Sequence, residues 1–327
     1  MSDTGPVSRR SFLGNSVAAL AATAEGAAPA PQSPATANPP PPRPSGMTYG
    51  MIGKVKISRM MLGGNLVSGF MHNRDLMYVP QLFRAYVTEE KIFETFKVCE
   101  EHGINTVFES GNAQVQRYNR ERGGHMQIIP SVHPTLDFDP RKVKDEVKGL
   151  VDTGVPALYC WGVVSDSLVR AGRVDIIAKT VEIIKDHGLP AGVGGHSLSV
   201  PKACEKAHVP CDFYVKTLHT DNYSSAVPKE LRKDYMWIDG GPGFYDNMWC
   251  INAEETVAFM HSVRKPWIAF KILAAGAIPP HDAFHHAFHS GADFVAVGMF
   301  DFQIKGNCEI LNRVVRNSKT RPRPWYA

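Results

Sequence analysis

Short apolar segments alternate with amphipathic stretches along most of this chain, and polar residues gather where each apolar segment ends. The eight apolar segments are residues 57–64, 105–110, 126–132, 157–163, 190–195, 212–218, 267–273 and 293–299. Most are too short and too apolar for exposed helices, which is typical of strands buried on both faces of a sheet. Eight such strands, each followed by a helix, predict the α/β class and a single (β/α)8 barrel, or TIM barrel, over residues 47–320.

The stretches between the predicted strands carry helix start and stop signals. Residues 88–102 place Ile92 and Phe96 at helical spacing. Thr88 is the predicted N-cap and Gly103 the predicted stop. The same pattern recurs in residues 141–153, 174–187 and 281–290, which precede Gly154, Gly188 and Gly291. Each glycine can adopt the left-handed conformation that lets the chain turn back into the barrel.

The glycine turns precede the strands, and in a barrel the loops at that end contribute to stability. Functional groups are therefore expected in the loops that follow the strands. Two of these loops are long, residues 66–87 and 219–251. The second contains DGGPGFY at residues 239–245, where glycines permit motion and aromatic rings can cover a ligand. We interpret this segment as a candidate lid, and a rigid surface loop is the alternative.

The first 30 residues have the features of a targeting segment. Arg9 and Arg10 stand in SRRSFL, an alanine-rich stretch follows, and ATA at residues 22–24 offers a cleavage site. Residues 1–30 therefore resemble a twin-arginine signal peptide, and a disordered alanine-rich tail is the alternative. Residues 31–46 are rich in proline and poor in apolar side chains, which predicts a disordered linker. We expect the Tat export machinery as a partner and a periplasmic or other extracytoplasmic location.

Composition narrows the classes of partner. The 327 residues are 43% hydrophobic and 21% charged, which is ordinary for a globular enzyme. No apolar run reaches the length of a membrane span, so no stable membrane anchor is expected. The formal charge of +4 is spread thinly apart from a short basic tail at residues 313–323, so we expect no nucleic-acid partner. Six cysteines without a C-x-x-C pair predict buried free thiols, although an oxidising compartment would permit a disulfide.

Polar side chains at the predicted strand ends form the candidate site, because a barrel mouth brings such residues together around one ligand. They are Asn65, Glu109, His133, Trp161, Asp166, His196, Lys216, His219, Asp221, Lys271 and Asp301. From this set we select Glu109, His133, His196 and Lys271 as catalytic candidates.

Glu109 ends an otherwise apolar strand, where a carboxylate suits general acid or base chemistry. The alternative is a structural ion pair with an arginine such as Arg117. His133 precedes Pro134, which imposes an extended exit from the strand and holds the imidazole at the rim. His196 follows the glycines of GVGG, where a ligand can approach the backbone closely, and a buried structural histidine is the alternative.

Lys271 lies in the apolar run WIAFKIL, where a lysine is costly unless it is paired or functional. Desolvation would lower its pKa and permit imine or general-base chemistry. Lys216 in FYVKTLH has a similar setting, and we expect at least one of the two lysines to lie between barrel and helices and extend to solvent. Lys271 is the preferred candidate.

A divalent metal is the alternative cofactor, with Glu109, His133, His196, His219 and Asp221 as the pool of ligands. The sequence contains no H-E-x-x-H or H-x-H pattern that would select ligands from this set, so no metal ligands are assigned. A second group of histidines, at positions 281, 285, 286 and 289, has helical spacing and is interpreted as a solvated helix face.

The order of motifs resembles the aldo-keto reductase superfamily over most of residues 52–317. GKVKISRMMLGG at 53–64 is similar to that family's opening hairpin and first strand, and EHGINT at 101–106 to the entry of its second strand. Residues 188–197, KPWIAFKILAAG at 265–276 and ADFVAVGM at 292–299 are further similar segments. The chain departs from the family where Glu109 replaces an aspartate, His133 lies near the position of a lysine, and Trp161 near that of a histidine.

This resemblance implies a carbonyl or sugar-type small molecule as substrate and NADP or NAD as cofactor. It places Gly298, Lys305 and Asn307 at the phosphate end of the cofactor, with Glu109 and His133 in place of the usual acid and its partner. Two other functions stay open. One is a lyase, epimerase or isomerase that uses Glu109, His133, His196 and Lys271 for proton transfer, with or without a metal. The other is a non-catalytic ligand-binding barrel.

Overall fold

The computed structural model describes residues 46–73, 76–232, 246–318 and 320–327. The predicted signal peptide, residues 31–45 of the predicted linker and the candidate lid at residues 239–245 lie outside these ranges.

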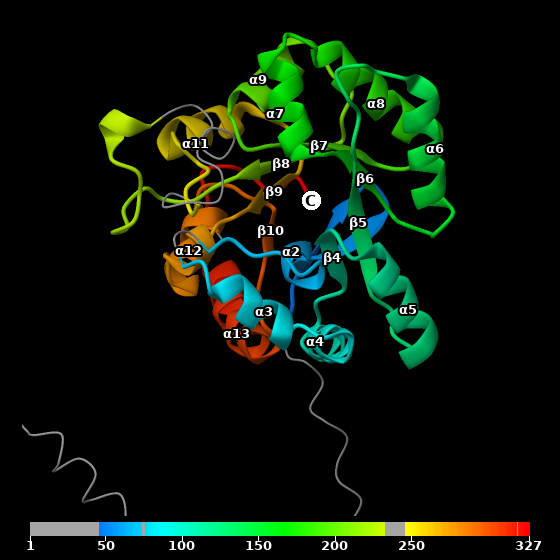
Figure 1. Ribbon diagram of the computed structural model, residues 1–327. Coiled ribbons are helices and arrows are strands. Elements are labelled where there is room, and N and C mark those ends of the chain that lie inside the picture. The colour runs from blue at the N-terminus through cyan, green and yellow to red at the C-terminus, as the bar shows by residue number, and fades with distance from the viewer. Residues whose placement is uncertain (1–45, 74–75, 233–245, 319) are drawn as a thin grey trace, which may run out of the picture. The chain divides into compact units, whose positions relative to one another are not determined.

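Eight parallel strands close into a barrel, and helices surround them (Figure 1). The strands are β3 (Met60–Gly63), β4 (Thr106–Glu109), β5 (Gln127–Val132), β6 (Leu158–Cys160), β7 (Ala191–Gly195), β8 (Phe213–Thr217), β9 (Trp267–Phe270) and β10 (Phe294–Val297). They are arranged in sequence order, and β10 closes the barrel by pairing with β3. The predicted (β/α)8 barrel is confirmed, and each predicted segment contains one barrel strand.

The first predicted strand, residues 57–64, was wrong as a single element. An antiparallel hairpin of β1 (Tyr49–Ile52) and β2 (Val55–Ser58) precedes the barrel, and the chain bends at Arg59 before β3 begins. The guanidinium of Arg59 donates to the backbone oxygen of Asp293 at 2.9 Å, and Ser58 Oγ donates to the oxygen of Met60 at 2.6 Å. These bonds hold the bend that divides the apolar run between two sheets.

Helices occupy the stretches between the strands. They are α2 (Gly64–Val67), α3 (Val79–Tyr86), α4 (Glu89–Glu101), α5 (Asn112–Arg122), α6 (Pro140–Val151), α7 (Gly162–Arg170), α8 (Val174–Asp186), α9 (Ser199–Lys206), α11 (Ala253–Ser262), α12 (Pro280–His289) and α13 (Asp301–Asn317). Short 3-10 turns cover Lys229–Leu231 and Ala274–Gly276. Four of these helices, α4, α6, α8 and α12, confirm the predicted ones.

The predicted caps are also present. Thr88 Oγ1 accepts a hydrogen bond from the Lys91 amide at 3.3 Å, which satisfies one of the free N–H groups at the start of α4. Gly103, which follows α4, has a φ of 82°, so its left-handed conformation reverses the chain toward β4. The glycines after the other three predicted helices, Gly154, Gly188 and Gly291, also have positive φ.

Alternation along the strands divides the core into two layers. Residues such as Phe108, Tyr159 and Ile268 fill the barrel interior, and the rings of Phe108 and Tyr159 stack with centroids 5.0 Å apart. Their neighbours along the strands, such as Val107 and Ala269, pack outward against the helices. Continued alternation therefore predicts whether a side chain at the end of each strand points into the barrel or outward toward the helices.

Two arginines near the C-terminal end, Arg321 and Arg323, pack against the barrel, whereas Arg313 and Arg316 are exposed on α13. Arg323 is fully buried, and its Nη1 donates to Asp293 Oδ2 at 2.8 Å. The same guanidinium donates to the backbone oxygens of Met260 and Val263, each at 3.0 Å. Arg321 lies 3.5 Å from the second Asp293 oxygen. These two cations serve to hold the chain end on the barrel rather than to form a basic surface.

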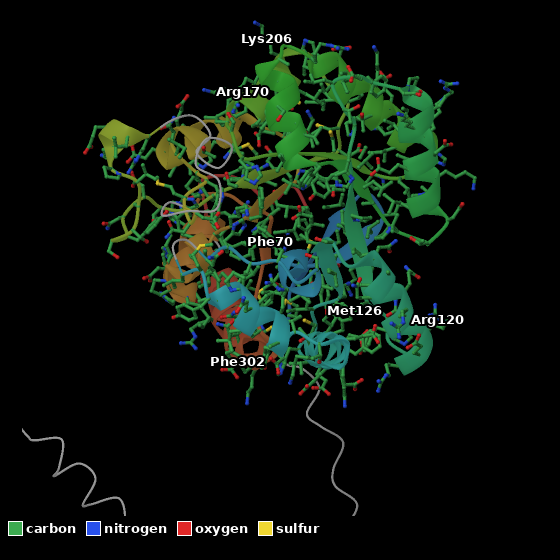
Figure 2. The ribbon with its side chains drawn as sticks, viewed as in Figure 1. Phe70, Arg120, Met126, Arg170, Lys206 and Phe302 are labelled. Carbon is green, nitrogen blue, oxygen red and sulfur yellow. The ribbon has the colours of Figure 1, made fainter. Side chains whose placement is uncertain are left out.

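Charged side chains extend from the helices around the barrel. Arg120, Arg170 and Lys206 extend outward from the peripheral helices, whereas Phe70 lies near the centre of the same view (Figure 2). All six cysteines are buried and unpaired, which confirms the prediction of free thiols. No helix in the described part of the chain has the length and apolar character of a membrane span.

Candidate active site

Lys271 and Glu109 both point into the barrel mouth because their backbones leave the strand conformation. Glu109 shares the parity of Val107, and Lys271 that of Ala269, so continued alternation would direct both side chains outward. Instead Glu109 has a φ of 80° and Lys271 a φ of 58°. A non-glycine residue in this left-handed region costs about 1–2 kcal/mol. Strain of this kind clusters at functional sites, so the two residues mark the mouth as the candidate active site.

The Lys271 ammonium is surrounded by aromatic groups. Its Nζ lies 4.3 Å from the centre of the Trp249 ring and donates to His72 Nε2 at 2.5 Å. Burial is the main cause that lowers the pKa of Lys271 to about 8, and the carboxylates of Glu109 and Asp246 oppose this shift. A substantial share of the side chain is therefore an unprotonated amine in mildly alkaline solution.

His72 connects this lysine to a buried carboxylate. Its Nδ1 lies 2.9 Å from Asp246 Oδ1, and its Nε2 faces the donors of Lys271 and Asn65. Because Nε2 must accept from these donors, we assign the proton of the neutral ring to Nδ1. Burial and the nearby lysine lower the pKa of His72 to about 4, so the ring is neutral at physiological pH.

Sequence reasoning identified Asn65 and Lys271 but missed His72 and Asp246. Both missed residues lie in the two long loops that follow barrel strands, and loop length was the only signal that pointed to them. Nothing in the spacing of these residues predicts that the two loops meet over the end of β9.

Glu109 is held by an indole. Trp161 Nε1 donates to Glu109 Oε1 at 2.6 Å, and this bond orients the carboxylate over the mouth. The alternative interpretation, an ion pair with Arg117, was wrong. Arg117 instead pairs with Glu121 and Glu89 on the outer helices. Glu109 therefore stays available for chemistry at the mouth.

His196 is buried beside a second carboxylate, Asp166. Its Nδ1 lies 2.8 Å from Asp166 Oδ2, and the backbone N–H groups of His196 and Ser197 donate to the same carboxylate. Burial lowers the pKa of His196, while the Asp166 hydrogen bond opposes that shift. The sequence left two interpretations for His196, a residue that faces a ligand and a buried structural histidine. Both apply in part, because Asp166 holds the ring and His196 also lines a cavity at the mouth.

His133 lies at the rim, outside the cavities that contain the other three catalytic candidates. Its Nδ1 lies 2.7 Å from Glu146 Oε1, and its side chain is 47% exposed. The ring meets Trp161 edge-on at 5.1 Å between centroids. His133 therefore contacts the residues around the mouth through Trp161, which holds Glu109, and through Ser131, whose Oγ lies 3.1 Å from His133 Nε2.

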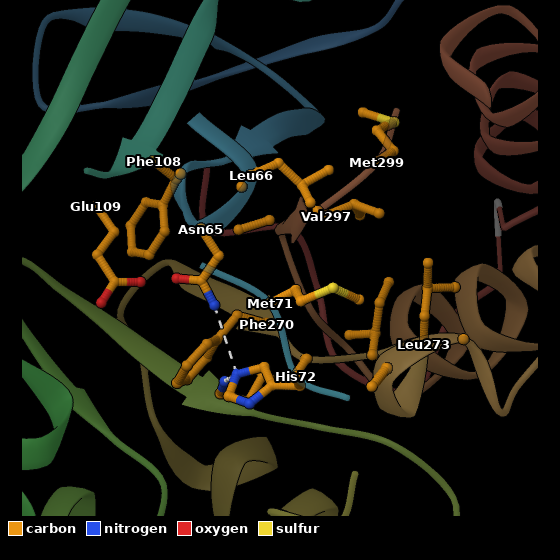
Figure 3. Close-up of a pocket in the computed structure, with 18 of the residues that line it drawn as sticks. Asn65, Leu66, Met71, His72, Phe108, Glu109, Phe270, Leu273, Val297 and Met299 are labelled. Atoms are coloured by element: carbon orange, nitrogen blue, oxygen red, sulfur yellow. Dashed lines mark hydrogen bonds between the residues drawn. The ribbon is translucent and has the colours of Figure 1, made fainter. Parts of the chain in front are cut away.

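Two cavities meet at Lys271. One has a volume of about 260 Å³ and the other about 290 Å³. The residues that line both are Asn65, Phe70, His72, Glu109, Phe270 and Lys271. Figure 3 shows Asn65, His72 and Glu109 on one side of the first cavity and Leu273, Val297 and Met299 on the other.

Other polar residues at the strand ends have structural partners. Lys216 lies between barrel and helices but is only 1% exposed, so the expectation that such a lysine extends to solvent was wrong. Its Nζ instead donates to Thr217 Oγ1 at 2.8 Å. His219 Nε2 accepts two backbone N–H bonds, and Asp221 pairs with Arg232. Asp301 accepts from Tyr86 and Lys91 at the start of α13.

The three residues predicted to hold a nicotinamide cofactor are only partly brought together. Gly298 lines the first cavity. Lys305 is exposed on α13, and neither it nor Asn307 lines that cavity. Asn307 is buried and donates to Met299 Sδ at 3.4 Å. Lys271 and His72 are the basic side chains among the described residues that line the first cavity.

The pool of predicted metal ligands is dispersed. Within the part of the chain that the structure describes, no three His, Cys, Asp or Glu side chains are close enough to hold one metal ion. The histidines at 281, 285 and 289 form a stacked row along α12, away from Lys271 and Glu109.

Comparison with known proteins supports the architecture. No family model matches the sequence, and no curated protein matches it. Two solved structures from Pseudomonas aeruginosa, each described as a "putative aldo-keto reductase", align with TM-scores of 0.54 and 0.55. They are 13% and 14% identical to this chain, cover 84% and 82% of it, and are themselves covered to 96% and 95%. The likeness shows a shared barrel fold. At this identity it does not extend to the chemistry.

Proposed function

We propose that this barrel is an enzyme that acts on a small carbonyl compound, with Lys271 as the group that reacts with the carbonyl carbon. The observation that carries the proposal is the placement of Lys271. Its amine is held in the mouth by a left-handed backbone, and its pKa is lowered to about 8. At pH 7.5 such a pKa leaves roughly a quarter of the amine unprotonated, against about 0.1% for an ordinary lysine.

The reaction begins when the neutral Lys271 amine attacks the carbonyl carbon and forms a carbinolamine. Loss of water then forms a protonated imine, and the hydroxyl leaves with a proton from a neighbouring acid. Glu109 is the group assigned to this proton transfer, because it lines both cavities beside Lys271. The imine withdraws electrons from the adjacent carbon, which permits the proton transfers or carbon–carbon cleavage of an isomerase or lyase.

Reductive trapping tests this function. The protein is incubated with hydroxyacetone, glyceraldehyde or pyruvate and treated with borohydride, which converts an imine into a stable secondary amine. We expect a mass increase on the peptide that contains Lys271. The adduct should be lost in Lys271→Met and kept in Lys305→Met, a matched change on the exposed face of α13. Adducts that spread over surface lysines and spare Lys271 would overturn the proposal.

The second candidate is an NADP- or NAD-linked oxidoreductase. Gly298, which the resemblance assigns to the phosphate end of the cofactor, lines the first cavity, and the two aligned Pseudomonas structures bear the name of a reductase family. Lys305 and Asn307, the other two residues that the resemblance assigns to the cofactor, do not line that cavity, which weighs against this candidate. Quenching of Trp249 emission by NADPH, with a stoichiometry near one, would favour it, because Trp249 lines that cavity.

Export is part of the proposal for the whole chain and rests on Arg9, Arg10 and the alanine-rich stretch after them. The Tat route requires the arginine pair, so Arg9→Lys with Arg10→Lys should retain the protein in the cytoplasm. Fractionation of cells that express the two forms measures this. Equal amounts outside the cytoplasm would refute export by this route.

A further inference from the structure

His72 presents one ring nitrogen to Lys271 and the other to Asp246. Its Nε2 lies 2.5 Å from Lys271 Nζ, and its Nδ1 lies 2.9 Å from Asp246 Oδ1. The side chains of His72 and Asp246 are only 11% and 2% exposed, so water does not compete freely for these contacts. Because a carboxylate only accepts hydrogen bonds, Asp246 holds the proton of the neutral ring on Nδ1. Nε2 is then an acceptor for Lys271.

These contacts limit how the neutral Lys271 amine can be oriented. An amine nitrogen carries two N–H bonds and one lone pair at tetrahedral positions. One N–H is directed at His72 Nε2, and the other can face the Trp249 ring, whose centre lies 4.3 Å from Nζ. The lone pair then occupies the position that faces neither ring. In this orientation it is free to attack an electrophile in the cavities that Lys271 and Glu109 line together.

We propose that Asp246 is a positioning residue that keeps Lys271 nucleophilic by fixing the tautomer of His72. This inference rests on the proposed function, because Lys271 is the attacking group in both. In the opposite tautomer, Nε2 would carry the proton and donate it to the Lys271 lone pair, so the amine would be held in place but unable to attack. Asn65 Nδ2 lies 3.4 Å from Nε2, so the amine at 2.5 Å is the nearer partner for that proton.

Asp246→Asn tests the proposal, because the new amide can donate to Nδ1 and move the ring proton of His72 to Nε2. The readout is acetylation of Lys271 by acetic anhydride at pH 9.5, followed by mass analysis of the peptide. The amine nitrogen bonds to the acetyl carbon, acetate leaves, and the nitrogen gives one proton to solvent. Loss of the Asp246 charge lowers the pKa of Lys271 further, so a slower reaction cannot come from a protonated amine.

The rank order of the variants distinguishes positioning from structural support. In a Ser-His-Asp triad, the wrong tautomer lowers kcat about 10⁴-fold, so we expect Asp246→Asn to slow acetylation of Lys271 by at least roughly 100-fold. His72→Phe removes both ring nitrogens and leaves the lone pair unbound, so the loss should be only about tenfold, the worth of one hydrogen bond. A structural role predicts the reverse order, because His72→Phe removes the whole imidazole.

Two further variants complete the series. Asp246→Glu restores a carboxylate and should recover most of the acetylation rate of Lys271. Asp282→Asn is the matched control, because it removes the carboxylate from an exposed pair on α12, where His281 Nδ1 lies 3.1 Å from Asp282 Oδ1. This change should leave the rate unaltered.

Nitrogen NMR of histidine-labelled protein gives a direct signature of the tautomer, with the His72 signals assigned by their loss in His72→Phe. We expect the proton on Nδ1 in the unchanged protein and on Nε2 in Asp246→Asn. A proton on Nε2 in the unchanged protein would overturn the inference without any variant. So would no measurable acetylation of Lys271 in that protein, an unaltered rate in Asp246→Asn, or a larger loss in His72→Phe. Acetylation needs no imine, so the expected rates without any borohydride trapping on Lys271 would overturn the proposed function alone.

Discussion

Replacement of Lys271 by methionine is expected to stabilise the fold near neutral pH. The ammonium of Lys271 is partly desolvated, and its pKa falls from 10.5 to about 8. One pKa unit corresponds to about 1.4 kcal/mol, so the folded protein carries a cost of at most about 3 kcal/mol for this charge. Methionine has a similar length and no charge, and it keeps the contact with Trp249, so Lys271→Met removes the cost.

The stabilisation depends on pH in a defined direction. Well below pH 8 the lysine is protonated in both the folded and the unfolded chain, so the full cost is present. Between about pH 8 and 10.5 the unfolded chain binds a proton that the folded chain lacks, so the unchanged protein gains stability as pH rises. Above this range the lysine is neutral in both states. The part of the stability difference between Lys271→Met and the unchanged protein that comes from the charge then disappears.

Thermal unfolding at pH 7 and pH 10.5 measures the effect. For a barrel of roughly 270 residues, about 3 kcal/mol corresponds to a rise in Tm of about 5 °C. The Tm of Lys271→Met should exceed that of the unchanged protein at pH 7 by up to this amount, and the gap should narrow at the higher pH. Lys305→Met, on the exposed face of α13, controls for loss of one charge. A gap that stays constant between the two pH values would refute the reasoning.

Three further changes test other parts of the structure. Arg323→Ala should lower the free energy of unfolding by about 3–5 kcal/mol, measured in urea, because it leaves the buried carboxylate of Asp293 poorly compensated; a cost below about 1 kcal/mol would contradict this. Glu109→Gln removes a charge that raises the pKa of Lys271, so the pH of half-maximal borohydride trapping should fall, and a rise would contradict the assigned electrostatics. Gly64→Ala places a Cβ 2.5 Å from backbone atoms of Phe108 and Ser110 at the end of β4 and should cost about 1–3 kcal/mol in urea unfolding; an unchanged midpoint would contradict this and show that this segment shifts to make room.

The elements of the fold were predictable because their signals are local. Apolar runs, helical spacing and the glycines after α4, α6, α8 and α12 all act within about 15 residues of chain. The error at residues 57–64 has a long-range cause. The guanidinium of Arg59 donates to the backbone oxygen of Asp293 and so bends the chain, and nothing near Arg59 in the sequence indicates that partner.

The site was only partly predictable. Glu109, His196 and Lys271 were identified because polar residues at the ends of apolar strands are rare and costly. His133 was selected on the same grounds but lies at the rim, held by Glu146. His72, although in direct contact with Lys271, was missed, because its position depends on the path of a long loop.

The sequence alone predicted the barrel, since eight apolar segments, each followed by a helical stretch, are typical of this fold. It also determined that Glu109 and Lys271 would stand at strand ends. Only the tertiary structure decided where their side chains point, because alternation directs both outward and the left-handed backbone at each reverses that direction. The pairing of His72 with Asp246 was likewise decided by the meeting of two loops far apart in sequence, a contact that no local pattern encodes.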